Sequence, residues 1–138
     1  MRPFHLAIPV DDLPAARHFY GTVMGCAQGR SSDHWVDFDL FGHQLVIHHV
    51  PDYRGVAAGM NAVDGHAVPV PHFGIILTPD QFDALAERLA RAGCAFIHPP
   101  MLRFAGQAGE QRTMFLADPA GNALEFKAFA DDAMIFSA

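Results

Sequence analysis

Two histidines and one glutamate lie in three strand-like segments of the sequence. His5 begins "HLAIPV", His72 begins "HFGIIL", and Glu125 lies within "ALEFKAF". Two imidazoles and one carboxylate are the ligand set of the facial triad, which leaves coordination positions open for substrate, water or dioxygen. These ligands suit Fe(II), Mn(II), Ni(II) or Zn(II), and the lack of a thiolate in the set argues against a closed structural zinc site.

Side chains alternate between the two faces of a strand, so each segment has one face with the His or Glu and one opposite. The opposite faces carry the bulkier apolar residues: Leu6, Ile8 and Val10; Phe73, Ile75 and Leu77; Leu124, Phe126 and Ala128. Such faces suit packing against a helix, which leaves the faces of His5, His72 and Glu125 for a site. A histidine among small residues is also typical of an ordinary surface, so the pattern alone leaves both interpretations open.

The elements that position these residues occur twice along the chain. "HLAIPVDDLPAARHFY" and "HFGIILTPDQFDALAERL" both begin with His and continue as strand, cap and helix. The first helix is predicted to begin after Asp11 or Asp12, and the second to begin after Thr78 and end at Gly93. Strands are predicted in "HWVDFDL" and "HQLVIHHV" of the first half, and in "RTMFLAD" and "ALEFKAF" of the second.

The repeat assigns a counterpart to Glu125. Placing Gly42 against Gly121 aligns "GHQLVIHHV" with "GNALEFKAF", so Val46 corresponds to Glu125. The first histidine precedes Val46 by 41 positions and the second precedes Glu125 by 53, so the second half has 12 additional residues. We place most of them in a loop around residues 104–111, which is either a lid or pocket wall or an ordinary surface excursion.

Composition limits the class of protein. The chain has 138 residues, of which 51% are hydrophobic and 17% charged, which predicts one globular domain. A net charge of -6 and a single lysine, Lys127, argue against binding to nucleic-acid phosphates or anionic lipid. We expect no signal peptide and no membrane span, and because Cys26 and Cys94 form no spaced pair, we expect a reduced cytoplasm.

The sequence resembles the vicinal oxygen chelate superfamily, which includes glyoxalase I, extradiol dioxygenases, methylmalonyl-CoA epimerase, fosfomycin-resistance enzymes and bleomycin-binding proteins. The likeness covers nearly the whole chain and rests on "HLAIPVDDLPAARHFYGTVMGC", "PHFGIIL" and "FLADPAGNALEFKAF". The last stretch is the most specific, because an Asp-Pro-x-Gly-Asn turn before a strand with Glu is characteristic of these proteins.

The resemblance implies an α+β fold in which two tandem βαβββ modules form a curled mixed sheet around a metal-binding cleft. We expect a single domain over residues 1–138, with module one at about 1–50, a connection at about 51–70, module two at about 71–130 and a C-terminal tail at 131–138. Members commonly form homodimers. The apolar tail "AMIFSA" is therefore expected either to join an interface, to cover the cleft or to pack on its own domain.

Carried over to this sequence, the resemblance implies that His5, His72 and Glu125 are the metal ligands. Val46 departs from the pattern of glyoxalase- and epimerase-like members, which often have a fourth ligand there, whereas extradiol dioxygenase-like members use two His and one Glu. A register shift of two would place Gln44 or His48 at that position instead.

We therefore predict an extradiol dioxygenase-like metalloenzyme, with Fe(II) favoured over Mn(II), Ni(II) or Zn(II), acting on a small substrate that chelates the metal through neighbouring oxygens. His48 is the first candidate for an acid or base beside the metal, followed by His98 and Tyr53. Arg103 and Arg112 are candidates for orienting an anionic substrate group. The alternatives are a glyoxalase- or epimerase-like isomerase or lyase, and a dimeric protein that sequesters a ligand without catalysis.

Overall fold

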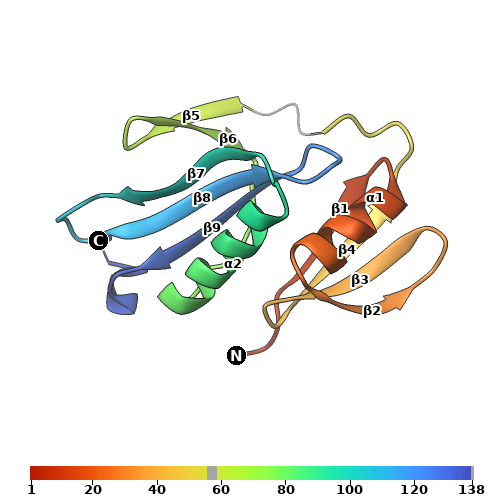
Figure 1. Cartoon of the computed structure of the whole chain (residues 1–138), viewed down its shortest axis with the longest axis horizontal. Helices are drawn as coiled ribbons and strands as arrows, with labels where there is room; N and C mark the ends of the chain where they lie inside the picture. The colour runs from red at the N-terminus through yellow and green to blue at the C-terminus, as the bar shows by residue number, and fades with distance from the viewer. Residues whose placement is uncertain (56–58, 138) are drawn as a thin grey trace. The chain divides into compact units, whose positions relative to one another are not determined.

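The computed structural model describes residues 1–55 and 59–137 and divides the chain into two compact units (Figure 1). Unit 1 consists of residues 1–55 together with 118–122, and unit 2 contains the described residues 59–117 and 123–137. The boundary near Gly55 falls within the predicted connection of residues 51–70, and residues 56–58 of that connection and Ala138 of the tail lie outside the described residues.

Unit 1 is built on a mixed four-stranded sheet. Its elements are β1 (His5–Val10), α1 (Leu13–His18), the π-helical turn η1 (Phe19–Val23), β2 (Ala27–Ser31), β3 (Trp35–Leu40) and β4 (His43–His49). The strand order is β1-β4-β3-β2, in which β1 runs parallel to β4 and the other neighbours are antiparallel. The predicted faces of β1 are confirmed, since Ile8 and Val10 are buried and His5 is exposed.

Unit 2 is built on an antiparallel three-stranded sheet with one helix. Its elements are β5 (Gly59–Val63), β6 (His66–Val70), α2 (Pro79–Arg91), β7 (Phe96–Arg103), β8 (Gln111–Ala117), β9 (Ala123–Phe129) and the 3-10 turn η2 (Asp132–Met134). The order is β7-β8-β9, and residues 72–77 run parallel to β9 through bridges at Phe73 and Ile76. After its β5–β6 hairpin, unit 2 repeats the order of unit 1 with residues 72–77 in the place of β1, and the predicted α+β fold with βαβββ modules is confirmed.

Both helices begin at the predicted caps. The side chain of Asp12 accepts a hydrogen bond from the Ala15 amide at the start of α1, and Thr78 and Gln81 form a reciprocal capping box at the start of α2. Gly93, just beyond α2, has a φ of +72°, which favours glycine and ends the helix as the sequence predicts. No helix in the described residues is long and apolar enough to cross a membrane.

The sheet of unit 2 has two different faces. The face toward α2 is fully apolar at its centre, since Met114, Leu116, Leu124 and Phe126 are all completely buried there. Because directly paired residues share a face, the other side carries Glu125, its partner Phe115 on β8, and His98 opposite Phe115 on β7. Packing against the helix thus fixes which way Glu125 points.

The turn between β8 and β9 belongs to unit 1 and is held by a buried carboxylate. Asp118 accepts hydrogen bonds from the amides of Ala120 and Asn122, from the Asn122 side chain and from the Tyr20 hydroxyl. The Asn122 side chain also donates to the Pro9 carbonyl. Burial, and then the neighbouring Asp118 charge, raise the pKa of Tyr20 well above its usual value. The Asp and Asn of the turn motif are therefore structural residues of unit 1.

Three sequence predictions of local structure need correction. Residues 59–70 form the hairpin β5–β6 instead of an unstructured connection, with positive φ at both Asp64 and Gly65 of its turn. No strand is predicted directly before the loop of residues 104–111, but residues 98–103 belong to β7, and the two prolines are tolerated because β7 is an edge strand. The segment "HFGIIL" forms bridges to β9 in place of a regular strand, and β2 was not predicted.

Candidate functional site

Two of the three predicted metal ligands lie next to each other in unit 2. His72 Nε2 is 3.0 Å from Glu125 Oε2, and the Glu125 residue is only 7% exposed. Glu125 sits in the middle of β9, whereas His72 begins the segment that runs beside that strand. The structure therefore places an imidazole nitrogen and a buried carboxylate at a separation suited to sharing one cation.

Contacts with Pro69 and Phe115 fix the orientation of the His72 ring. Its Nδ1 lies 2.6 Å from the carbonyl oxygen of Pro69, and its ring meets the Phe115 ring edge-on with centroids 5.2 Å apart. A carbonyl can only accept, so this contact selects the tautomer with the proton on Nδ1 and the lone pair on Nε2. A carbonyl partner on the far nitrogen is the usual arrangement behind a metal-binding histidine.

In that tautomer, Nε2 of His72 and Oε2 of Glu125 are two acceptors that face each other. A cation held between these two atoms would be bound by both of them. The donor set therefore fits a divalent metal of the kind that the sequence predicts. Within residues 1–55 and 59–137, no group of three or more His, Cys, Asp or Glu side chains is arranged as a metal site, so the structure shows this pair alone.

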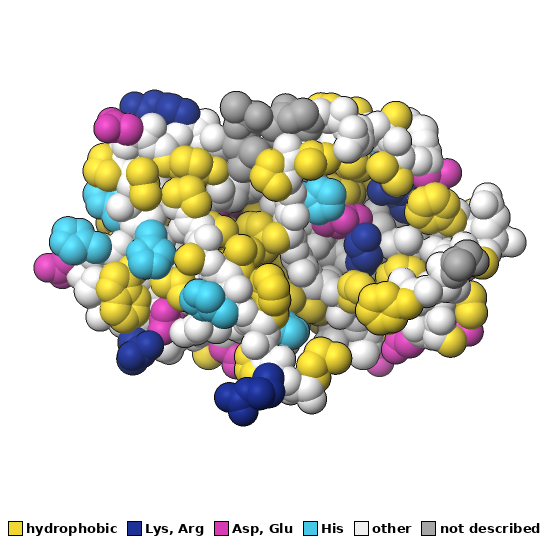
Figure 2. Space-filling model, turned by 180° about the vertical axis from the view of Figure 1, so that it is seen from behind, with side chains coloured by type: hydrophobic (Ala, Val, Ile, Leu, Met, Phe, Trp, Pro, Cys, Tyr) yellow, Lys and Arg dark blue, Asp and Glu magenta, His cyan; other side chains and the backbone are white. Residues whose placement is uncertain are grey.

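Lys127 is a further member of this face. Its Nζ is 3.3 Å from Glu125 Oε2, on the same side of β9 two residues further along. Figure 2 shows His, acidic and basic side chains lying together in a recess on the right of that view. The sequence prediction gave Lys127 no role in the site, although alternation along the strand was a signal that it shares the face of Glu125.

Glycine at position 74 allows the strand of Glu125 to come this close. Gly74 lies opposite Glu125, and a Cβ at Gly74 would overlap the carbonyl carbon and oxygen of Glu125. The flanking backbone hydrogen bonds, Glu125 N–H to Phe73 and Lys127 N–H to Ile75, hold the two segments together. The position of the Glu125 carboxylate thus depends on a glycine in the neighbouring segment.

His5, the third predicted ligand, belongs to unit 1. Its Nδ1 is 2.8 Å from Gln44 Oε1, and the Gln44 amide nitrogen donates to Asp37 Oδ2 at 3.3 Å. Because the side-chain nitrogen of Gln44 faces Asp37, the side-chain oxygen of Gln44 faces His5 and accepts a hydrogen bond from Nδ1–H. His5 and His72 therefore both have Nδ1 held by an acceptor and the lone pair on Nε2.

The strand registers give Val46 the position that the sequence alignment assigns to it. The residue two after His5 pairs with Val46, and the residue two after His72 pairs with Glu125. Val46 is buried in β4, while Gln44 is the residue paired with His5. The residue paired with Val46 on the next strand, β3, is Asp37. The Asp37 carboxylate forms an ion pair with Arg30 at 3.6 Å.

The predicted acid–base candidates lie in different surroundings. His98 lies on the Glu125 face, with its ring against Phe115 and its Nε2 2.6 Å from the Ala67 carbonyl. His48 is exposed at the end of β4 in unit 1. Tyr53 donates to Asn122 at 2.5 Å, and burial, followed by Asp118, raises its pKa. Of these three residues, His98 shares a sheet face with Glu125.

The two predicted substrate-binding arginines lie on opposite faces of the sheet of unit 2. Arg103 is only 3% exposed and pairs across the sheet with Gln111, on the face of Glu125. Arg112 is on the α2 side, where it forms an ion pair with Asp83 and stacks over Phe82. The structure therefore places Arg103, and not Arg112, on the face of the candidate metal ligands.

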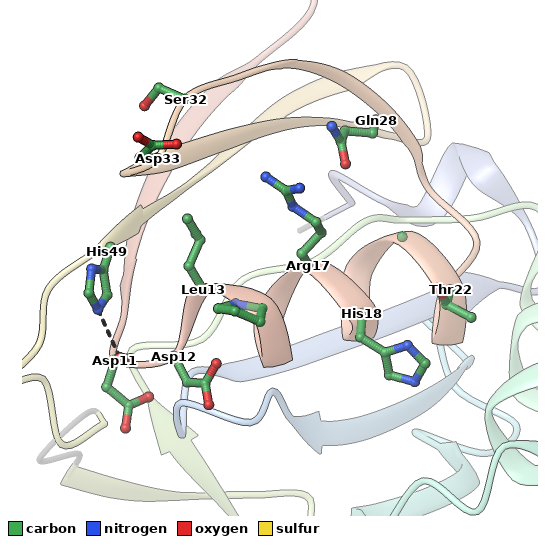
Figure 3. Close-up of a pocket in the computed structure, with 12 residues that line it drawn as sticks. Asp11, Asp12, Leu13, Arg17, His18, Thr22, Gln28, Ser32, Asp33 and His49 are labelled. Atoms are coloured by element: carbon green, nitrogen blue, oxygen red, sulfur yellow. Dashed lines mark hydrogen bonds between the residues drawn. The ribbon is translucent and has the colours of Figure 1, made fainter.

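A separate cavity of about 800 Å³ lies in unit 1, between α1, the β2–β3 turn and the end of β4 (Figure 3). Arg17 extends into it from α1, and Asp33 lies on the opposite wall. His49 closes one end of the cavity. Its Nε2 donates a hydrogen bond to the Asp11 carbonyl at 3.1 Å. The cavity contains none of the predicted site residues, and its exposed charges are of both signs.

Comparison with known proteins gives one family and a set of similar structures. The model described as the Glyoxalase/Bleomycin resistance protein/Dioxygenase superfamily matches residues 2–126. A glyoxalase/bleomycin resistance protein/dioxygenase from Alicyclobacillus acidocaldarius is 38% identical over 97% of this chain and 96% of that chain, with a TM-score of 0.82. The search of curated proteins finds no match.

More distant structures show the fold alone. A genomically encoded fosfomycin resistance protein from Listeria monocytogenes is 17% identical over 94% of this chain and 93% of that chain, with a TM-score of 0.69. A lactoylglutathione lyase from Agrobacterium tumefaciens is 22% identical over 98% of this chain and 96% of that chain, with a TM-score of 0.67. Proteins described by different activities therefore share this fold, and activity has to be argued from the site.

Proposed function

Because the chain belongs to the glyoxalase/bleomycin resistance protein/dioxygenase superfamily, we propose that it is a metal-dependent enzyme of the extradiol dioxygenase type. Its substrate would be a small molecule that chelates the metal through neighbouring oxygens. His5, His72 and Glu125 would hold the metal, with Fe(II) favoured over Mn(II), Ni(II) or Zn(II). The observation that carries the proposal is the pair of acceptors, His72 Nε2 and Glu125 Oε2, 3.0 Å apart.

His5 joins the proposed ligand set through its equivalence to His72. The two residues begin equivalent segments of the two units, and each has Nδ1 against an acceptor, Gln44 in one case and Pro69 in the other. This arrangement presents Nε2 of both imidazoles as a ligand atom. When bound, the metal supplies Lewis acidity and a template for two reactants.

The remaining chemistry is assigned to the side chains around Glu125. The Phe115 ring packs edge-on against the His72 ring and helps to hold its orientation. His98 lies opposite Phe115 in the sheet, and with its Nε2 proton held by Ala67 it presents Nδ1 as a proton acceptor. We propose His98 as the acid or base of the reaction ahead of His48 and Tyr53, since it shares the face of Glu125.

Val46 is the reason to favour dioxygenase chemistry over the other activities of the superfamily. A valine cannot supply the fourth ligand that glyoxalase- or epimerase-like members often have at this position. Retention of His5, His72 and Glu125 argues against a protein that only sequesters a ligand. A lactoylglutathione lyase with this fold makes the lyase alternative worth testing directly.

The test is oxygen consumption by the purified, iron-reconstituted protein with a panel of catechols. We expect uptake with at least one catechol, and a loss of at least about 100-fold in Glu125→Gln and His72→Ala, because each removes a proposed ligand. Glu87→Gln is the matched control, since Glu87 is an exposed residue of α2 that pairs with Arg91. Metal-dependent turnover of a hemithioacetal without oxygen uptake would instead establish a glyoxalase-like lyase, and binding without metal or turnover a sequestering protein.

A further inference from the structure

Three buried polar atoms on the Glu125 face of unit 2 have no hydrogen-bond partner among the described residues. They are Arg103 Nε, Gln111 Oε1 and Thr113 Oγ1, each on β7 or β8. Buried polar groups in proteins are nearly always paired, so three unpaired groups on one face require an explanation. They comprise a charged donor, an acceptor and a hydroxyl that serves as either.

The sheet register places these groups in consecutive rows next to the candidate metal ligands. Arg103 pairs with Gln111, Thr113 pairs with Lys127, and the next row pairs Phe115 with Glu125. Alternate residues on a strand are about 7 Å apart, so the Thr113 row lies about 7 Å from the Glu125 row and the Arg103 row about 13 Å. The unpaired atoms thus begin one row away from the Glu125 carboxylate.

Arg103 is a buried cation for which the described residues supply no counter-ion. Its Nη2 donates to the Val63 carbonyl at 2.8 Å and its guanidinium lies 5.7 Å from the Phe104 ring centroid. Among residues 1–55 and 59–137, none of the ion pairs involves Arg103. A guanidinium stays charged at all relevant pH values, and a buried charge is stable only with an opposite charge or full hydrogen bonding.

The geometry points to a binding site for a carboxylate on this face, made by Arg103, Thr113 and Gln111, and we propose that it selects substrates with an anionic end. Nε and Nη2 form one edge of the guanidinium, which matches the two oxygens of a carboxylate. The carboxylate would take the place of the Val63 carbonyl at Nη2 and give Nε its missing partner. Thr113 would donate to the same group, and Gln111 Oε1 would accept from a hydroxyl or water bound with it.

This proposal rests on the proposed function only for the other end of the substrate. If vicinal oxygens bind at Glu125 and His72, the row spacing places the carboxylate about 7–13 Å away along the strands. The substrate class is then an extended vicinal diol or catechol that carries a carboxylate at its far end. Plain catechol would leave Arg103 Nε without a partner and should bind weakly.

The experiment compares 3-(3,4-dihydroxyphenyl)propanoate with its primary amide, by calorimetry on the full-length protein under nitrogen. We expect the acid to bind at least about 10-fold more tightly, because a charge-assisted pair with Arg103 is replaced by a neutral contact in the amide. Arg103→Gln should abolish this preference and Thr113→Val, which keeps the volume, should reduce it. Arg112→Gln is the matched control and should retain it, since Arg112 lies on the other face with Asp83.

Equal binding of acid and amide by the wild-type protein would overturn the proposal without any variant. A preference that survives Arg103→Gln but is lost in Lys127→Met would also overturn it, because the anion would then bind at Lys127. The proposal would also be overturned if Thr113→Val changed the stability of the protein but not its preference for the acid. That result would indicate that Thr113 binds a structural water instead of the carboxylate. Repeating the titration after chelation separates this site from the metal proposal, since the preference for the acid should persist without metal.

Discussion

Unit 1 and unit 2 place a histidine at the same point of the same segment, but they surround it differently. In unit 1 the neighbours of His5 in the sheet are the neutral Gln44 and, one row on, the apolar Val46. In unit 2 the corresponding row contributes Glu125, with Lys127 beside it. The repeated architecture thus keeps one imidazole in each half and places a carboxylate next to that imidazole in the second.

Each unit has a buried carboxylate near its histidine, but the two carboxylates have different neighbours. The buried carboxylate on the Val46 row of unit 1 is Asp37, which Arg30 and Gln44 already occupy. Glu125 of unit 2 is buried as well and pairs with Lys127, but the same oxygen also faces His72, which offers a lone pair. A carboxylate whose neighbours are all donors stabilises a sheet, whereas one that also faces an acceptor is placed to bind a further cation.

Gly74→Ala should have the largest effect on stability. Ala7 occupies the equivalent row of unit 1 opposite Val46, but a Cβ at Gly74 would overlap the Glu125 carbonyl. We expect a loss of about 3 kcal/mol in unfolding free energy, measured by urea denaturation, since the backbone of β9 must move. Gly21→Ala is the control, because its Cβ would meet only the Phe38 ring at 3.4 Å. An equal and small effect of both changes would show that unit 2 tolerates a side chain there.

Val46→Glu would make the first half resemble the second. The new carboxylate would be buried opposite Asp37, so we expect a loss of about 2 kcal/mol without metal. The neutral Val46→Gln should cost less. If position 46 corresponds to the fourth ligand of glyoxalase-like members, Mn(II) should restore more stability to Val46→Glu than to the wild type in thermal unfolding. An identical Mn(II) response in both proteins would contradict that correspondence.

Tyr20→Phe should remove an alkaline loss of stability that belongs to unit 1, which has both tyrosines of the chain. Because the pKa of Tyr20 is raised in the folded state, the unfolded chain ionises first, and wild-type stability should fall as the pH rises from about 10. Tyr20→Phe removes the hydrogen bond to Asp118, so its unfolding free energy should be about 1–2 kcal/mol lower near neutral pH. Its unfolding free energy should, however, change less with pH above about 10. A wild type with no loss above that pH would contradict the raised pKa.

Thr78→Ala should have the smallest effect, because it removes only the cap of α2. Its side chain accepts a hydrogen bond from the Gln81 amide, and the Gln81 side-chain oxygen accepts one from the Thr78 amide. We expect a loss of about 1 kcal/mol in chemical denaturation, with Thr78→Ser close to the wild type. Asp12→Ala in unit 1 provides the comparison, since α1 has a single cap bond in place of a box. A larger loss in Asp12→Ala would show that the box adds nothing.

The elements with strong local signals could be predicted from the sequence. The capped helix after Thr78, the strands on either side of Gly42 and the βαβββ order follow from periodicity and repetition. The β5–β6 hairpin was missed although Asp64 and Gly65 are a favoured pair for its turn, because "HAVPV" contains a proline that weakens a strand prediction.

The site could be predicted only in part, because its contacts join residues far apart in sequence. Alternation placed Glu125 on the face opposite Phe126, and packing against α2 bears this out. The contact of His72 with Pro69 depends on a loop, and the unpaired atoms of Arg103 and Thr113 depend on strand register. Neither feature has a periodic signature in the sequence.

The most direct test of the account is the metal content of the protein after anaerobic reconstitution with iron or manganese and removal of excess metal. We expect about one divalent ion per chain in the wild type and in the control Glu87→Gln, and a loss of at least about 100-fold in affinity in His5→Ala, His72→Ala and Glu125→Gln. Circular dichroism would confirm that the variants fold. A folded wild-type protein that remains free of metal, or variants that keep the metal, would contradict the account.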